Sequence, residues 1–456
     1  MNTKHYTTQL HQFRQELYSN LTYRPDATMD LIDSLSTNSK ARSVVELSLS
    51  PFFRRSYSSV TDSIDNFFSR STPEKAGTER LEAAQKWMRI ISHYLEPPKR
   101  KFWLFGIDVT PAPRRFSSTL EDRVFVYQPN AISGNQPVTI GHQFSFLSAL
   151  PEKEERDTPS WTVPLLVNRV TSKDTATKIA TQQTEMLLTD KTLPFYQKFC
   201  VNVVDSAYSA ASYLGRVQHH KNLVVIARLR GNRTLYREPK LSSAKKRGKA
   251  HPTWYGKPFS LKKPETWHDP NQSCQFTYLS RRNKEYTVKI EAWHNLLMTG
   301  KQDIPLHQYP FTLVRIRYFD AQGREAFKRP LWLIVMGKRR HELSLSDIWE
   351  SYQQRYDLEH FFRFGKQHLL MAAYQTPEVE HEENWWQIVS LVSVQLYLAR
   401  HLAQAMPNSW EKYLSTFKSD KMVASPTRTL RDFGRIIGQI GTPAKVPKPR
   451  GKSPGR

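Results

Sequence analysis

The first part of the chain carries hydrophobic residues at three- and four-residue spacing, the period of a helix with one apolar face. This pattern predicts helices over residues 9–21, 27–35 and 80–95. Polar, turn-forming stretches such as 69–73 separate them. We therefore expect residues 1–98 to form a small helical domain.

Short apolar runs bounded by turn residues replace the helical spacing after residue 98. The first run, 102–109, predicts a buried strand that ends in the turn-forming residues 110–113. The further predicted strands are 125–127, 143–150, 163–170, 199–204 and 222–228, and the predicted helices are 175–188 and 208–216. Strands that later alternate with helices favour an α/β fold, with a mixed sheet flanked by helices, over residues 99–229.

Residues 230–340 carry several strand-like runs in succession and predict a β-rich insertion. The insertion includes a basic loop, because residues 237–263 contain nine Lys or Arg and one acid. Three of these basic residues are Lys245, Lys246 and Arg247.

Helical spacing returns in residues 341–410. A long helix is predicted over 346–371, with Ser344 or Ser346 as its cap, and a second helix over 382–406. The last region, 411–456, ends in a basic tail rich in Pro and Gly, which we expect to be disordered.

The composition of the chain indicates what kind of partner the protein binds. The 456 residues carry a net charge of +25, and a protein this basic usually meets a polyanion. Nucleic acid is the first candidate and an anionic membrane surface the second.

The only cysteines, Cys200 and Cys274, exclude a disulfide scaffold and a CxxC metal site, and they fit a reducing compartment. No run of about 18 apolar residues predicts a membrane span, and residues 1–10 do not resemble a secretory signal.

Three acids stand out by their positions. Asp108 and Asp205 lie at the ends of predicted buried strands, and Glu359 lies in the long helix. A carboxylate near a low-dielectric interior needs compensation, and a divalent cation supplies it, since hard oxygen ligands suit Mg²⁺ or Mn²⁺. For each acid taken alone, a helix cap or a salt bridge explains the residue as well.

The helix that carries Glu359 also places two cations and a phenol on the same stripe. At about 100° per residue, Tyr352, Arg355, Glu359 and Lys366 fall within about 60° of one another. This set suits a metal ion beside a phosphate backbone, with the carboxylate on the metal and the other groups on phosphate oxygens. The alternative is an exposed helix face with an i,i+4 ion pair.

The spacing Y-x2-R-x3-E-x6-K of these four residues resembles the signature of the insertion-sequence-four superfamily of DDE transposases. The resemblance covers residues 100–406 and implies a ribonuclease-H-like core with a β-rich insertion. It also implies that Asp108, Asp205 and Glu359 are catalytic and hold two Mg²⁺ or Mn²⁺ ions. In this family a Trp of the insertion stacks on a flipped base during hairpin formation, and Trp332 resembles it.

The resemblance further implies double-stranded DNA as the partner, namely the terminal inverted repeats of a mobile element and its target. It implies a homodimer when two ends are held together, and N-terminal helices that help to recognise them. We expect a cytoplasmic, nucleoid-associated protein that does not bind a membrane. No nucleotide cofactor is expected, since no GxxxxGK[ST] loop is present. A hydrolytic nuclease or resolvase on the same fold, and a domesticated DNA-binding protein without activity, are the two alternatives.

Two weaker features remain. The basic run Lys338, Arg339 and Arg340 is expected to contact the DNA backbone. Histidine pairs suggest a transition metal, but they lack a recognised metal-ligand spacing and are expected to face solvent or phosphate. These histidines are His219, His220, His360 and His368.

Overall fold

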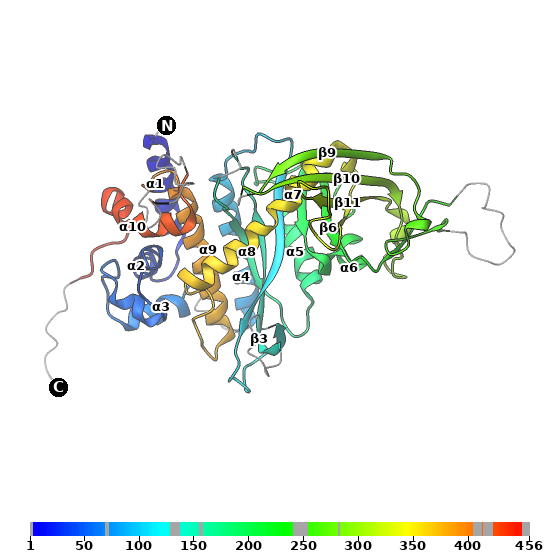
Figure 1. The fold of residues 1–456 in the computed structure, drawn as a ribbon. Helices are drawn as coiled ribbons and strands as arrows, with labels where there is room; N and C mark the ends of the chain where they lie inside the picture. Colours follow the sequence, from blue (N-terminus) through cyan, green and yellow to red (C-terminus); the bar gives the residue numbers. More distant parts are fainter. Residues whose placement is uncertain are drawn as a thin grey trace.

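A mixed sheet runs through the molecule, and helices cover both of its faces (Figure 1). The computed structural model describes residues 3–68, 73–127, 137–153, 155, 158–239, 254–280, 283–404, 413 and 423–448. Within these residues the sheet has ten strands in the order β2-β3-β1-β5-β6-β12-β11-β10-β9, with β4 also paired to β3. The predicted α/β class is confirmed, and the fold is consistent with a ribonuclease-H-like core.

The strands of this sheet are β1 (Trp103–Pro113), β2 (Val124–Tyr127), β3 (Val138–Ala149), β4 (Val163–Arg169), β5 (Cys200–Val204), β6 (Leu223–Leu229), β9 (Gln272–Leu279), β10 (Glu285–Leu296), β11 (Phe311–Phe319) and β12 (Leu331–Met336). A separate hairpin consists of β7 (Thr234–Tyr236) and β8 (Pro258–Ser260). Strands β1, β5 and β6 are parallel, whereas β3 pairs antiparallel with β1.

The insertion continues the central sheet. Strand β12 pairs antiparallel with β6, and β11, β10 and β9 follow outward from it. An exposed β6 edge would leave backbone donors and acceptors unpaired, and β12 satisfies them. Figure 1 shows the long strands β9 to β11 projecting on the side of the molecule away from α10.

Strand β1 is longer than the hydrophobic pattern predicts. The apolar run suggests an end near Val109, but pairing with β3 continues to Pro113. Pairing of β1 with β5 stops at Ile107, so the last residues of β1 need hydrogen bonds on one side only. Prolines at 111 and 113, which lack an N–H, are tolerated in such an edge position.

The helices are α1 (Thr3–Asn20), α2 (Pro25–Ser36), α3 (Ser58–Asp65), α4 (Pro73–His93), α5 (Ala176–Thr189), α6 (Ala211–Leu214), α7 (Leu345–Gln354), α8 (Tyr356–His368), α9 (Val379–Ala399) and α10 (Pro426–Ile440). The short 3-10 helices are η1 (Val45–Leu49), η2 (Ser206–Ser209), η4 (Pro264–Thr266), η5 (Leu306–Gln308) and η6 (Arg340–Glu342). Helices α3 and α10 lie in stretches for which the sequence pattern predicted no helix. Among the described residues, no helix has the length and apolar character that a membrane crossing requires.

Side-chain alternation along β3 shows which helices cover which face. Phe144 stacks on Trp386 of α9, and Phe146 contacts Phe361 of α8. Ser145, which points to the opposite face, donates a hydrogen bond to Gln183 of α5. Helices α8 and α9 therefore cover one face of the core sheet and α5 covers the other.

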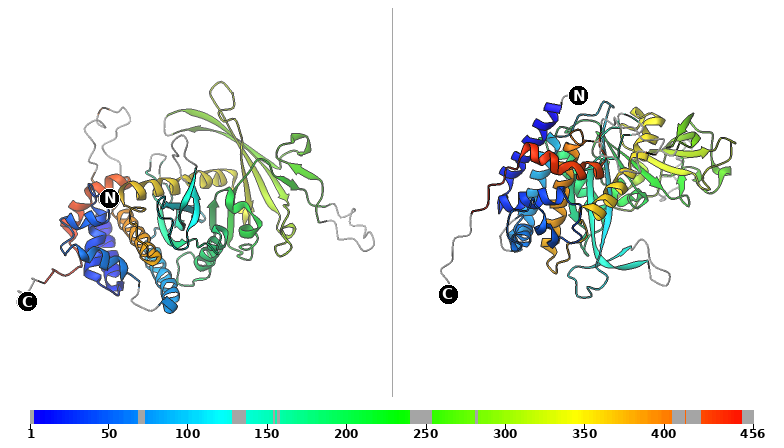
Figure 2. Two further views of the ribbon diagram at one scale, coloured as in Figure 1. Left: turned by 90° about the horizontal axis from the view of Figure 1, so that it is seen from below. Right: turned by 60° about the vertical axis from the view of Figure 1, so that its left-hand side comes forward.

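The N-terminal helices pack around α9 together with α10, as both views in Figure 2 show. At their centre Arg14 of α1 is fully buried and pairs with Asp33 of α2 at 2.6 Å. The same guanidinium donates to the Gln395 side chain of α9. A buried charge of this kind is stable only when its donors are satisfied, so Arg14 links the N-terminal helices to α9.

The predicted long helix is two helices with a short interruption. Ser344 is the N-cap of α7, and its side chain forms a capping box with Asp347. The interruption falls at Arg355, whose backbone remains right-handed, with φ −54° and ψ −32°. Helix α8 then runs in nearly the same direction along the sheet (Figure 1).

Candidate active site

Two of the three predicted acids lie side by side at the same edge of the sheet. Ile107 of β1 is paired in parallel register with Val204 of β5. Asp108 and Asp205 are the next residues along these two segments. They therefore lie next to each other, at the same height in the sheet. Because Gly106 pairs with Val203, residues 106, 108, 203 and 205 share the face that α8 covers.

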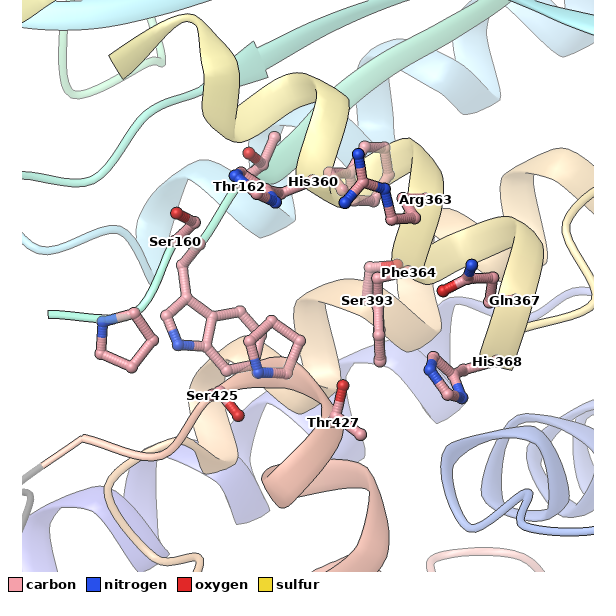
Figure 3. Close-up of a pocket in the computed structure, with 14 residues that line it drawn as sticks. Ser160, Thr162, His360, Arg363, Phe364, Gln367, His368, Ser393, Ser425 and Thr427 are labelled. Atoms are coloured by element: carbon pink, nitrogen blue, oxygen red, sulfur yellow. The ribbon is translucent and has the colours of Figure 1, made fainter. Parts of the chain in front are cut away.

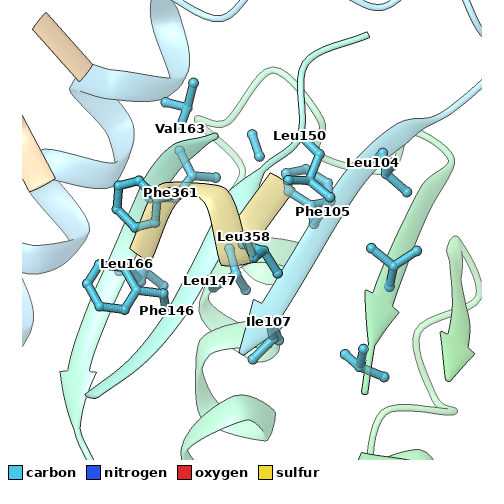
Figure 4. Packing of buried hydrophobic residues seen from close by; sticks show 14 of the residues in the cluster. Leu104, Phe105, Ile107, Phe146, Leu147, Leu150, Val163, Leu166, Leu358 and Phe361 are labelled. Atoms are coloured by element: carbon cyan, nitrogen blue, oxygen red, sulfur yellow. The ribbon is translucent and has the colours of Figure 1, made fainter. Parts of the chain in front are cut away.

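Helix α8 brings the third acid to the same place. Leu358 is fully buried against β1, and Gly106 permits this close approach. A Cβ atom at Gly106 would lie only 2.8 Å from Cδ1 of Leu358. Figure 4 shows Leu358 and Phe361 on α8, and the ring centre of Phe361 lies 5.5 Å from that of Phe146. Glu359 follows Leu358, and its charge acts on Asp108.

Arg355 joins the helix to the strand by ion pairs. Its Nη1 lies 3.1 Å from Oδ2 of Asp108, and its Nη2 lies 2.6 Å from Oε1 of Glu359. The Arg355 side chain is 8% exposed and that of Asp108 16%, whereas Glu359 is 47% exposed. The Arg355–Glu359 pair predicted as the alternative is therefore present, but it is part of a three-residue bridge and not of a solvated helix face.

The surroundings of Asp108 disfavour its charge. Burial raises the pKa of its carboxyl to about 6; Arg355 opposes this shift, and the negative charges of Asp205 and Glu359 add to it. All three acids therefore interact electrostatically. Besides the contact with Arg355, Asp108 accepts a hydrogen bond at Oδ1 from the backbone N–H of Val109, at 2.9 Å.

Of the other two residues of the stripe, Lys366 is half-buried and Tyr352 is buried. Lys366 donates from Nζ to the Pro111 carbonyl of β1 at 2.8 Å, and burial lowers its pKa to about 8. Tyr352 is 2% exposed, and the Arg355 guanidinium lies 5.9 Å from the centre of its ring. Burial raises the pKa of the Tyr352 hydroxyl to about 12, so it remains a hydrogen-bond donor at neutral pH.

Arg228 is a neighbour of the site that the sequence analysis did not single out. Val204 of β5 pairs with Ala227 of β6, so Arg228 lies at the same level as Asp205. Its side chain is exposed, and its charge acts on the Tyr352 hydroxyl. An isolated Arg in a strand gives no signal in the sequence, because its position beside Asp205 depends on the pairing of β5 with β6.

Tyr208 lies close to the two aspartates. It is 1% exposed, and its pKa is raised first by burial and in addition by the charges of Asp108 and Asp205.

His142 has a structural role. Its Nδ1 lies 2.6 Å from a Glu382 carboxylate oxygen, and its Nε2 lies 2.9 Å from the Glu121 carbonyl.

Trp332 lies at the same sheet edge but is not exposed there. It is 4% exposed and packs with Trp267 and Trp293, at ring-centre distances of 5.5 and 5.9 Å. Arg315 reaches over all three rings, at 4.7 to 5.7 Å, and pairs with Glu291. Base stacking by Trp332 therefore requires that this aromatic cluster open, and the assignment stays a prediction.

The predicted basic run lies at the other end of the sheet. Met336, at the end of β12, pairs with Val225 near the start of β6, so the following residues are remote from Asp205. Arg339 stacks on Phe199 at 4.2 Å and pairs with Glu342, while Lys338 is exposed. Arg340 donates to the side chain of Asn295. The basic residues Lys245, Lys246 and Arg247 lie outside the described residues.

A cavity of about 300 Å³ lies on the other flank of α8 (Figure 3). Figure 3 shows His360, Arg363 and Gln367 along one wall and Thr427 of α10 opposite. None of the residues that line it is a predicted catalytic acid. The cavity and the acids therefore belong to different surfaces of the same helix.

The three acids have the chemistry of a divalent-metal site, although their ligand atoms do not all lie within 4.8 Å of one another in this structure. They offer carboxylate oxygens from three elements, the donors that Mg²⁺ and Mn²⁺ prefer. The pKa of Asp108 is raised mainly by burial, and the charges of Asp205 and Glu359 add to the shift in spite of Arg355, so the ionised acid cluster is not fully compensated. A divalent cation held by Asp108, Asp205 and Glu359 would correct this imbalance.

Comparison with known families agrees with this geometry. A family model described as DDE superfamily endonuclease matches residues 16–299, which is more than half of the chain. The match includes Asp108 and Asp205 and ends before α8, so the place of Glu359 rests on the structure. A search of curated proteins found no match. The chain belongs to the DDE superfamily endonucleases.

Proposed function

We propose that this protein is the transposase of a bacterial-type insertion sequence. It would bind the terminal inverted repeats of its element, cut the DNA strands there and join the freed ends to target DNA. The observation that carries the proposal is the Arg355 bridge, because it ties Glu359 to Asp108 beside Asp205. The Y-x2-R-x3-E-x6-K spacing supports the insertion-sequence-four type.

In this proposal Asp108, Asp205 and Glu359 are the metal ligands, for two Mg²⁺ or Mn²⁺ ions. Metal ions bound there would activate the attacking oxygen and stabilise charge on the phosphate. Membership in the DDE superfamily supports divalent-metal chemistry.

The cations of the stripe would bind the DNA phosphate. Arg355 has five N–H donors, and its Nε is buried with no hydrogen-bond partner among the residues that the structure describes. It can therefore exchange its bond to Asp108 or Glu359 for a phosphate oxygen. The Tyr352 hydroxyl, kept protonated by burial, would orient that phosphate. Lys366, which donates to the Pro111 carbonyl in this structure, would neutralise phosphate charge together with Arg355.

The remaining proposals concern DNA and assembly. The +25 charge supports binding of double-stranded DNA, and synapsis of two ends would need a homodimer. We also propose that the N-terminal helices recognise the repeats and that the protein acts in the cytoplasm, at the nucleoid. Trp332 would serve a hairpin intermediate, and Lys338, Arg339, Arg340, Lys245, Lys246 and Arg247 would contact the DNA backbone.

The test uses a DNA fragment that carries the inverted repeats flanking the gene, a circular target and Mg²⁺. Products joined to the target are expected with the natural protein. Glu359→Gln should abolish both cutting and joining while DNA binding persists. Glu380→Gln, at an exposed position of α9, is the matched control and should remain active. Cut products without joined products would overturn the proposal in favour of a hydrolytic nuclease, and equal activity of Glu359→Gln would overturn the catalytic assignment.

A further inference from the structure

Three metal-binding side chains meet on the side of the sheet that α5 covers. Glu185 lies near the end of α5, and His219 and His220 lie in the connection from α6 to β6. Their potential ligand atoms all lie within 4.8 Å of one another. The two histidines are adjacent in sequence, but Glu185 comes 34 residues earlier, so only the fold brings the set together.

Both imidazole rings contact the same carboxylate, that of Glu185. Nε2 of His219 lies 3.1 Å from Oε1 of Glu185, and Nε2 of His220 lies 3.0 Å from Oε2. Separations of about 3 Å are close to the edge of a tetrahedron around an ion whose ligands are at 2.0–2.2 Å. The ring centres of the two histidines are 3.9 Å apart.

The hydrogen bond on the far side of His219 determines which nitrogen is free. Its Nδ1 lies 2.9 Å from the Arg216 carbonyl, and a carbonyl can only accept, so Nδ1 carries the hydrogen. In a neutral ring Nε2 then presents a lone pair to a carboxylate oxygen, which also presents lone pairs. This contact is repulsive unless a proton or a metal ion lies between the two atoms. A backbone carbonyl behind a histidine is also the usual partner that orients a metal ligand.

His220 gives a second, independent observation. Its side chain is 9% exposed, and its Nε2 has no hydrogen-bond partner in the described part of the chain despite lying beside Glu185. A buried nitrogen that lies 3.0 Å from a carboxylate without hydrogen-bond geometry is poorly satisfied by that contact alone, and an ion shared by the two groups would satisfy it.

We propose that Glu185, His219 and His220 form a structural site for a transition-metal ion, of which Zn²⁺ is the best candidate. Two imidazole nitrogens and one carboxylate oxygen suit Zn²⁺, whereas Mg²⁺ prefers oxygen ligands alone. The 58% exposure of the His219 side chain leaves room for water as a fourth ligand.

The site is distinct from the acid cluster at the other edge of the sheet. His220 precedes the start of β6 at Leu223, whereas Asp108 and Asp205 lie at the opposite ends of the parallel strands. A bound ion would clamp α5 to the segment that leads into β6. It would therefore stabilise the sheet without taking part in strand cleavage.

The test measures zinc binding by the full-length, untagged protein after removal of metal with a chelator. Millimolar Mg²⁺ is kept present to occupy the acid cluster. We expect one Zn²⁺ per chain by elemental analysis and a higher Tm when Zn²⁺ is added. The double variant His219→Ala/His220→Ala should bind Zn²⁺ at least about 100-fold more weakly, since even outer-shell changes cost 10–100-fold.

Two further measurements guard against a variant that fails to fold. Co²⁺ added to the natural protein should give the visible absorption of a tetrahedral site with nitrogen ligands. Asp108→Asn, which alters only the acid cluster, should keep the full zinc content. Absence of Zn²⁺ and of the Co²⁺ spectrum from the natural protein would overturn the proposal, as would equal Zn²⁺ binding by a folded double variant. The histidines would then be an ion-paired surface cluster.

Discussion

Nη1 of Arg355 lies 3.1 Å from Oδ2 of Asp108, across the junction between the helix pair α7–α8 and strand β1. The two residues are 247 positions apart in the chain. The same guanidinium holds Glu359, so one cation neutralises two acids that we propose as metal ligands. Under the proposed function, Arg355 would compete with metal for these carboxylates in the DNA-free protein.

This competition predicts opposite effects of one substitution on binding and catalysis. Arg355→Gln should raise the affinity of the DNA-free protein for Mn²⁺ several-fold, because the carboxylates lose their internal cation. Strand cleavage should fall by about 10-fold or more, since the phosphate loses a charge-assisted donor. Electron paramagnetic resonance of Mn²⁺ measures the first effect and a cleavage assay the second. Arg363→Gln, at an exposed position on the same helix, is the control. Unchanged or weaker Mn²⁺ binding by Arg355→Gln would contradict the competition.

The pKa of Asp108 predicts how stability depends on pH. Its folded-state pKa of about 6 lies above its ordinary value of 3.8, so between these values the folded protein binds the proton more strongly. Without metal, stability should therefore decrease as pH rises from about 4 to 6, by at most about 3 kcal/mol. Asp108→Asn should have a higher Tm than the natural protein in chelator at pH 7.5, with little difference at pH 4. A lower Tm at pH 7.5 would show that the Arg355 ion pair outweighs burial.

The affinity for metal should depend on the same Asp108 carboxyl, but it should increase with pH, whereas stability decreases. A proton on Asp108 excludes a metal ion from that oxygen, so Mn²⁺ affinity should fall as pH drops through about 6. Titrations at pH 5, 6 and 7.5 would measure this. Affinity that is independent of pH over this range would remove Asp108 from the ligand set.

Gly106 controls how closely α8 approaches β1. Gly106→Ala places a Cβ atom about 2.8 Å from the fully buried Leu358, so α8 must shift. We expect a loss of about 1–3 kcal/mol in stability and reduced cleavage, because Glu359 moves with the helix. Combining it with Leu358→Val should restore part of both. Gly438→Ala in α10, where no atom lies within 4 Å, should not lower the Tm. Full activity of Gly106→Ala would show that the site tolerates the displacement.

Trp332 should behave first as a core residue. Trp332→Ala removes a side chain that packs with Trp267 and Trp293, and should lower the free energy of unfolding by about 3–5 kcal/mol. Denaturant unfolding measures this effect. Trp332→Phe keeps an aromatic ring in the cluster and is the suitable variant for testing a role in hairpin formation. A stability change below about 1 kcal/mol in Trp332→Ala would contradict the packing that the structure shows.

Several features follow from local pattern alone. The spacing of Tyr352, Arg355, Glu359 and Lys366 places them on one stripe, and the apolar runs before Asp108 and Asp205 predict strands that end near these acids. The structure contains those strands, with Asp108 in β1 and Asp205 directly after β5. Periodicity and turn chemistry act over a few residues, so sequence is sufficient for them.

Other features depend on which segments pack together. The sequence leaves open whether Arg355 pairs only with Glu359 or also with Asp108, and the approach of α8 to Gly106 decides it. Likewise, Arg228 comes beside Asp205 through the pairing of β5 with β6, and Glu185 meets His219 and His220 through the packing of α5. These contacts join residues far apart in the chain. Their free energy comes from the burial and hydrogen bonding of whole elements, which no short stretch of sequence records.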